Sequence, residues 1–207
     1  AKVSTTTMER EEGMKATNRA NLEAWVDALT ERYIVVAPRL VQDDLLYGSV
    51  SSSSEVVFDF ERTVLSPKAF FLPDTEVLFH IEKRGKETAV SEPQLEREQV
   101  IFGIRPCDAQ GLRALDALLL DRPPPDAYYA ERREKTTLIG LACPQLWNDC
   151  FCTSLGSGPD DAANVDLMLY EGNGGYWILE TTEKGTALLE GLGVEDTEQA
   201  APTSVAD

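Results

Sequence analysis

The chain contains few of the residues on which many enzyme classes depend. Among 207 residues there are four cysteines and a single histidine, His80. His80 lies in an apolar, strand-like pattern without the partners of a Ser-His or Cys-His catalytic arrangement. We therefore predict a packed or surface histidine, and no catalytic residue. No apolar run approaches the roughly 20 residues that cross a bilayer. The first fifteen residues do not resemble a secretory signal peptide. We expect no membrane span and a cytoplasmic location.

Basic side chains are scarce as well. Nineteen Lys and Arg stand against thirty-six Asp and Glu, for a net charge of −17. Such a charge opposes a phosphate backbone, so we exclude nucleic acid as a partner. Phosphate-binding motifs are also missing. Gly156-Ser157-Gly158 lacks the strand-to-helix setting of a dinucleotide fingerprint, and no Walker-type lysine follows it. We predict a plain loop there.

The middle of the chain has the clearest pattern. Residues 99–104 form an apolar run, residues 108–120 carry leucine and alanine at helical spacing, and residues 136–142 form a second apolar run. Strand, helix and strand in this order predict a βαβ unit with parallel strands and a right-handed crossover.

The flanking segments predict further elements around this unit. A helix is expected around residues 22–29, and another over residues 182–192 with Thr182 as its cap. Gly172 to Gly175 predict the turn of a hairpin between strands 166–170 and 176–181. Other strands are predicted at 33–37, 45–47, 56–60 and 77–81, with a turn at 82–86 and a docked extended segment at 66–73.

The predicted fold class is therefore α/β. We expect a mixed, centrally parallel sheet in which the βαβ unit carries the cysteines at the carboxyl ends of its strands, followed by a C-terminal hairpin and helix. A chain of 207 residues is long enough for one ordinary domain. Residues 1–194 are expected to form a single α/β domain that carries the cysteine site, and residues 195–207 a disordered tail.

The four cysteines carry the functional prediction. Cys107 and Cys143 directly follow the two strands of the βαβ unit, and Cys150 and Cys152 lie on the next loop. Because parallel strands end at the same edge of a sheet, the four thiols are expected to meet there. Four converging thiolates repel one another unless a cationic centre that suits sulfur lies between them. The candidates are iron–sulfur and zinc.

The spacing favours iron–sulfur. Structural zinc sites usually take cysteines in pairs separated by two to four residues. This chain reads C-x35-C-x6-C-x-C and has no such pair. Zinc stays open as an alternative. Two disulfides are less consistent with a chain that has no secretion signal. Unconnected core cysteines are common, but all four residues cluster at strand ends and on one loop.

Residues next to the cysteines have predicted roles. A helix that begins after Cys107 would direct amide donors and its positive dipole end at the site. Asp108 is interpreted as the cap of this helix rather than as a ligand. Arg105 either supplies charge near the cluster or pairs with a carboxylate. The residues expected to shield the sulfurs from water are Pro106, Pro144 and Phe151.

Several strings resemble one known family, the beta subunits of soluble sulfhydrogenases and the A subunit of anaerobic sulfite reductase. They are Ser66-Pro67-Lys68, Gly103-Ile104-Arg105-Pro106-Cys107-Asp108, Asp126-Ala127-Tyr128-Tyr129 with Arg132-Arg133-Glu134, Cys143 with Cys150-Phe151-Cys152-Thr153-Ser154, and Gly156 to Pro159 followed by Asp166-Leu167. The similarity extends over roughly residues 65–189. Tyr128, Tyr129, Arg132 and Arg133 are either packing aromatics with solvated charges or a docking face.

The resemblance implies an iron–sulfur subunit, or its front domain, of an oxidoreductase complex. Such a subunit passes electrons between a flavin-containing reductase subunit and a catalytic hydrogenase or reductase subunit, and need not be catalytic alone. It also implies one [4Fe–4S] cluster with Cys107, Cys143, Cys150 and Cys152 as ligands, with [2Fe–2S] and zinc as alternatives. Family members usually continue into C-x2-C-x2-C runs, which this chain lacks. The alternative function is a zinc-binding structural scaffold module of a multiprotein complex.

Overall fold

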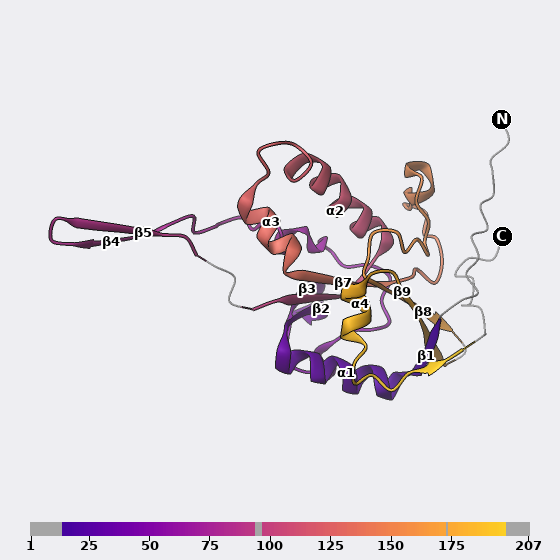
Figure 1. The fold of residues 1–207 in the computed structure, drawn as a ribbon. Helices are drawn as coiled ribbons and strands as arrows, with labels where there is room; N and C mark the ends of the chain where they lie inside the picture. Colours follow the sequence, from indigo (N-terminus) through magenta and orange to yellow (C-terminus); the bar gives the residue numbers. More distant parts are fainter. Residues whose placement is uncertain (1–13, 94–96, 173, 198–207) are drawn as a thin grey trace.

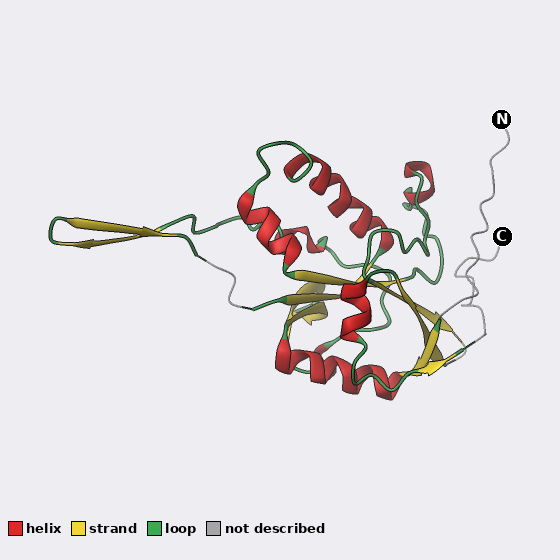
Figure 2. Ribbon diagram, viewed as in Figure 1, coloured by secondary structure: helices red, strands yellow, loops and turns green. Residues whose placement is uncertain are grey.

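The computed structural model describes residues 14–93, 97–172 and 174–197. Figures 1 and 2 show a central sheet with helices on both faces. Helices α2 (Pro106–Leu119) and α3 (Ala127–Glu134) cover one face, and α1 (Arg19–Arg32) and α4 (Glu183–Leu188) lie on the other. The arrangement confirms the predicted α/β class.

The sheet is mixed and parallel at its centre, as predicted. Strands β2, β6, β7 and β8 pair in parallel, and the outer pairs are antiparallel. In spatial order the strands are β10 (Glu195–Asp196), β1 (Lys15–Asn18), β9 (Gly175–Glu180), β8 (Leu167–Gly172), β7 (Thr136–Leu141), β6 (Gln99–Ile104), β2 (Ile34–Val41) and β3 (Asp44–Val50).

Strands β6 and β7 form the centre because their sequences are apolar without interruption. All six residues of β7 and five of the six in β6 are buried, as in sheets covered on both faces. The crossover between them contains α3 in addition to the predicted α2. Asp126, directly after three prolines, caps α3 by accepting a hydrogen bond from the backbone N–H of Tyr129 at 2.8 Å. This cap was the signal for α3 that the sequence prediction missed.

The opposite face is held by α1 and α4. Leu22, Trp25, Val26 and Leu29 of α1 are buried, and the indole Nε1 of Trp25 donates to the carbonyl of Leu188 at 2.8 Å. The hydroxyl of Thr182 accepts from the N–H of Gly185, which confirms the predicted cap of the closing helix.

Two predicted extended segments are wrong. Residues 56–60 form no strand but follow the short 3₁₀ helix η1 (Ser53–Glu55). Val56, Phe58 and Phe60 are nevertheless buried. The alternating apolar pattern therefore indicated side chains that pack in the core, although the segment pairs with no strand. The segment at 66–73 contains a second 3₁₀ helix, η2 (Pro67–Phe70), because proline suits the first helical position.

The strands β4 (His80–Arg84) and β5 (Glu87–Ser91) form a separate hairpin that projects from the body (Figure 1). Every residue of both strands is exposed, including His80, which is thus a surface residue. The prediction placed the strand three residues too early and the turn too broadly. Ile81 and Val90, which face each other across the hairpin, are 69% and 61% exposed, so apolar character did not mark burial here.

The C-terminal part differs from the expected boundary. Glu195 and Asp196 pair with β1, so regular structure extends two residues beyond position 194. The rest of the predicted tail, from residue 198, lies outside the described residues. No helix in the described ranges combines the length and the apolar character needed to cross a membrane.

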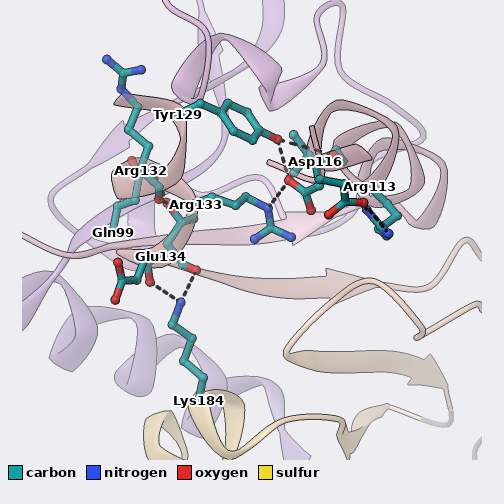
Figure 3. A network of polar contacts seen from close by, with 11 residues as sticks. Gln99, Arg113, Asp116, Tyr129, Arg132, Arg133, Glu134 and Lys184 are labelled. Atoms are coloured by element: carbon teal, nitrogen blue, oxygen red, sulfur yellow. Dashed lines mark hydrogen bonds and ion pairs between the residues drawn. The ribbon is translucent and has the colours of Figure 1, made fainter. Parts of the chain in front are cut away.

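A buried polar cluster joins α2 to α3 (Figure 3). The carboxylate of Asp116, a residue only 8% exposed, accepts from the hydroxyl of Tyr129 at 2.7 Å and from Nε of Arg133 at 3.1 Å. Arg132 donates to the carbonyl of Phe71 at 3.0 Å and forms an ion pair with Glu76. Tyr129 is therefore a packing aromatic, whereas the two arginines are paired rather than freely solvated.

Candidate functional site

The structure places Cys107 and Cys143 at the same edge of the sheet. The chain leaves β6 at Ile104 and reaches Cys107 three residues later, and it leaves β7 at Leu141 and reaches Cys143 two residues later. Since β6 and β7 are parallel neighbours, both exits lie on the same side. These positions agree with the sequence prediction for these two residues.

Gly103 produces a bulge in β6 that directs the chain into the site. The pairing register with β7 shifts between Phe102 and Ile104, and Gly103 has a φ of +78°. The bulge also interrupts the alternation of side chains between the two faces of the sheet. Ile101 and Ile104, three residues apart, pack in the same cluster on the α2 face. The hydroxyl of Tyr47 donates to the carbonyl of Gly103 at 2.9 Å and supports the bulge. Glycine is favoured because a side chain at positive φ is strained.

We predict that Gly103→Ala lowers the free energy of unfolding by about 1–2 kcal/mol, because alanine is strained in the left-handed region. Urea denaturation of the metal-free chain measures this. Gly111→Ala in α2 is the control: its new Cβ would lie 3.2 Å from Cε of the flexible Lys68, and alanine favours helix. The control should be neutral or stabilising. Equal losses in both variants would contradict the assigned role of the positive φ.

Cys150 and Cys152 lie on the loop after β7. The N–H of Trp147 donates to the Sγ atom of Cys150 at 3.3 Å. Cys152 begins the short 3₁₀ helix η3 (Cys152–Leu155), which ends at Gly156 with a φ of +76°. The N–H of Cys143 donates to the carbonyl of Pro159 at 2.8 Å, so the two ends of the loop are joined. The Gly-Ser-Gly segment is a loop, as predicted.

All four cysteines are free thiols. Only Cys143 is buried, whereas Cys107 and Cys150 are exposed and Cys152 is intermediate. The interpretation as unconnected core cysteines is therefore wrong for Cys107 and Cys150, and the structure contains neither of the two possible disulfides. The expected shielding is also incomplete: Pro106 is buried, but Pro144 and Phe151 are exposed.

The thiol of Cys143 responds to burial and to the charges around it. Burial raises the pKa of Cys143 to about 12; the Arg105 guanidinium lowers it, and the thiols of Cys107, Cys150 and Cys152, where deprotonated, raise it. Deprotonating all four thiols would place like charges near one another, which a positive centre would offset.

Helix α2 begins one residue before Cys107, not after it. The helix starts at Pro106 with Arg105 at the cap position, so Cys107 lies within the first turn. Asp108 is not the cap, which corrects the prediction. Loss of water around the thiol raises the pKa of Cys107, as does the Asp108 carboxylate, whereas the backbone N–H groups of Asp108 and Cys107 lower it. The positive end of α2 thus faces this sulfur.

Arg105 and Tyr47 complete the surroundings of the two strand-end cysteines. Arg105 is 4% exposed, and its Nη1 donates to the carbonyls of Leu141 at 3.2 Å and Ala142 at 2.8 Å. Burial raises the pKa of Tyr47, as do the charges of Asp108, Cys107 and Cys143. Tyr47 is a neighbour of the site that could not be predicted from the sequence. The residues next to Tyr47 in the sequence do not indicate a site. Tyr47 reaches the strand-end cysteines only because β3 pairs with β2 and β2 pairs with β6.

A cavity of about 130 Å³ lies beside Cys143. It is lined by Arg105 and Tyr170, by the carboxylate residues Asp59 and Glu171, and by apolar residues around them. None of the other three cysteines lines it. The cavity is therefore a neighbour of the thiol region and does not itself enclose the four sulfurs.

Four thiols are a donor set that suits a soft metal centre. Within the described part of the chain, no three His, Cys, Asp or Glu side chains form a ready-made metal site. Two free thiols at adjacent strand ends, two more on the following loop, a buried cation and a helix N-terminus nonetheless suit an anionic thiolate cluster. Cys107 and Cys143 follow the ends of β6 and β7, and Cys150 and Cys152 lie on the loop after β7.

The fold and the cysteine positions define a class, namely α/β proteins with two cysteines at the carboxyl edge of a centrally parallel sheet and two more on the loop that follows. The chain belongs to the sulfhydrogenase beta subunit family. It is 35% identical over 141 residues to sulfhydrogenase 2 subunit beta of Pyrococcus furiosus, covering 67% of this chain and 40% of that protein. The chain thus spans about two fifths of the length of this relative.

No family model matches the chain, and no solved structure matches it.

Proposed function

We propose that Cys107, Cys143, Cys150 and Cys152 bind one iron–sulfur cluster of the [4Fe–4S] type, and that the chain relays electrons within an oxidoreductase complex. The observation that carries the proposal is the position of Cys107 and Cys143 on adjacent parallel strand ends, with two further free thiols on the loop that follows. A bound cluster would supply reversible one-electron transfer. Membership of a hydrogenase subunit family supports this redox assignment.

The residues around the thiols would have supporting roles. The N–H groups in the first turn of α2 and the N–H of Trp147 direct hydrogen-bond donors at Cys107 and Cys150. Buried Pro106 limits water on the sheet side. Chemistry on a substrate would take place in other subunits. The partners that we propose are a flavin-containing reductase subunit and a catalytic hydrogenase or reductase subunit, in the cytoplasm, where thiols stay reduced.

Anaerobic purification followed by iron and acid-labile sulfide analysis tests the proposal. We expect about four irons and four sulfides for each chain, and visible absorbance that bleaches with dithionite. A colourless chain that contains zinc would contradict the electron-relay function and support a structural scaffold. Family membership does not favour that alternative.

A further inference from the structure

Arg105 is a buried cation whose polar contacts are all with backbone carbonyls. Its guanidinium donates to the carbonyls of Leu141, Ala142 and Phe60, and it lies over the Phe60 ring at 4.1 Å. The Nε atom has no hydrogen-bond partner, and no ion pair recorded between described residues includes Arg105. From its place in the sequence, Arg105 could either pair with a carboxylate or supply charge to the site, and these contacts favour the second role.

An unpaired charge in the interior is costly because it loses its hydration. Carbonyl dipoles and an aromatic face offset part of this cost, but a fixed positive charge is stabilised most by a negative group nearby. Burial lowers the pKa of Arg105, whereas the thiolate of Cys143, then the Tyr47 hydroxyl and the Cys107 thiolate, raise it; Glu171 has a smaller effect. Arg105 and Cys143 also line the same cavity, so the guanidinium lies beside a cysteine of the proposed cluster site, which would carry a negative charge as a bound thiolate.

The position of Arg105 in the chain gives it a second connection to both cysteines. The residue lies two positions before Cys107, and the carbonyl of Ala142 that accepts its hydrogen bond belongs to the residue directly before Cys143. One rigid, planar side chain therefore bridges the ends of β6 and β7. A lysine could keep the charge but could not donate to all three carbonyls from a fork.

We propose that Arg105 is a positioning residue that joins the two cysteine-bearing strand ends and provides the fixed positive charge that stabilises the reduced form of the bound cluster. This inference rests on the proposed function. Reduction by an external one-electron donor such as dithionite adds one negative charge to the cluster and its thiolates, and no bond to Arg105 forms or breaks. The extra charge is more stable beside a buried guanidinium than beside a neutral side chain.

The test compares midpoint potentials of Arg105→Gln, Arg105→Lys and the unmodified 207-residue chain, purified anaerobically and titrated with redox mediators while the visible absorbance is followed. We expect Arg105→Gln to make reduction at least tenfold less favourable, a shift of about 59 mV to lower potential for a one-electron couple. Arg105→Lys should recover most of the shift. Arg62→Gln is the matched control. It also removes one positive charge, but that charge belongs to an exposed ion pair with Asp149, a residue of the loop that carries Cys150 and Cys152. It should shift the potential little.

The outcomes separate the two proposals. A purely structural role would reduce cluster retention in Arg105→Gln without moving the potential of the fraction that keeps it, and that result would overturn the inference. If Arg105→Gln retains no cluster, Arg105→Lys decides: a potential close to that of the unmodified chain supports the role of charge, and a tenfold shift overturns it. An unmodified chain without iron and sulfide would overturn the proposed function as well.

Discussion

Cys143→Ala is expected to reduce the iron and sulfide content of the anaerobically purified chain to background. Cys143 is the buried member of the four and follows the fully buried strand β7, so no other thiol can move into its place. The proposed cubic cluster would lose one of its four thiolates, namely the one that lines the same cavity as Arg105. Because alanine is similar in size to cysteine and is accepted in apolar surroundings, the fold should persist.

Iron and sulfide analysis measures this effect, and circular dichroism checks the fold. The control is His80→Ala on the exposed hairpin strand β4, which should retain the cluster at the level of the unmodified chain. Equal iron content in the two variants would contradict the assignment of Cys143 as a ligand.

The second large effect is expected for Asp116→Ala, which should lower the free energy of unfolding by about 3 kcal/mol. The substitution leaves the fully buried Tyr129 hydroxyl without its 2.7 Å partner and Arg133 without its ion pair (Figure 3). Removing one member of a buried charged pair costs about 3–5 kcal/mol. The lower end applies because the Arg133 side chain is 22% exposed.

Urea denaturation of the metal-free chain measures this loss. Asp121→Ala is a matched control, since its ion pair with Arg113 is about half exposed on both sides and should contribute less than about 1 kcal/mol. Tyr129→Phe should give an intermediate loss of about 2 kcal/mol, because it removes only one hydrogen bond to a charged group. If Asp121→Ala lowered the free energy of unfolding as much as Asp116→Ala, burial would not be the reason for the stabilising effect of the Asp116 contacts.

The βαβ unit could be predicted because its signal is local. Residues 99–104 and 136–141 are continuous apolar runs, and such runs with a helix between them lead to parallel pairing. The hairpin at Gly172 to Gly175 and the Thr182 cap likewise depend on neighbouring residues only. Helix α3 was missed because the three prolines before it dominate the local pattern and hide the cap at Asp126.

Errors arose where a correct local pattern has more than one structural solution. The alternating apolar residues Val56, Phe58 and Phe60 predicted a strand. In the structure these side chains reach the core from an irregular segment. The apolar run at 77–81 predicted a strand, yet the strand begins at His80 and lies, fully exposed, on a projecting hairpin. In both cases, the outcome depends on which partners are available in space.

The amino-acid sequence by itself determined the centre of the sheet and the placement of Cys107 and Cys143 at its carboxyl edge, because apolar periodicity and parallel crossover rules act through adjacent residues. Only the tertiary structure decided the surroundings of these thiols. The burial of Arg105, its contacts with the carbonyls before Cys143, and the approach of Tyr47 from β3 all join segments distant in sequence. Electrostatic influence depends on distance and solvent exclusion in the folded state, and neither quantity is encoded in local spacing.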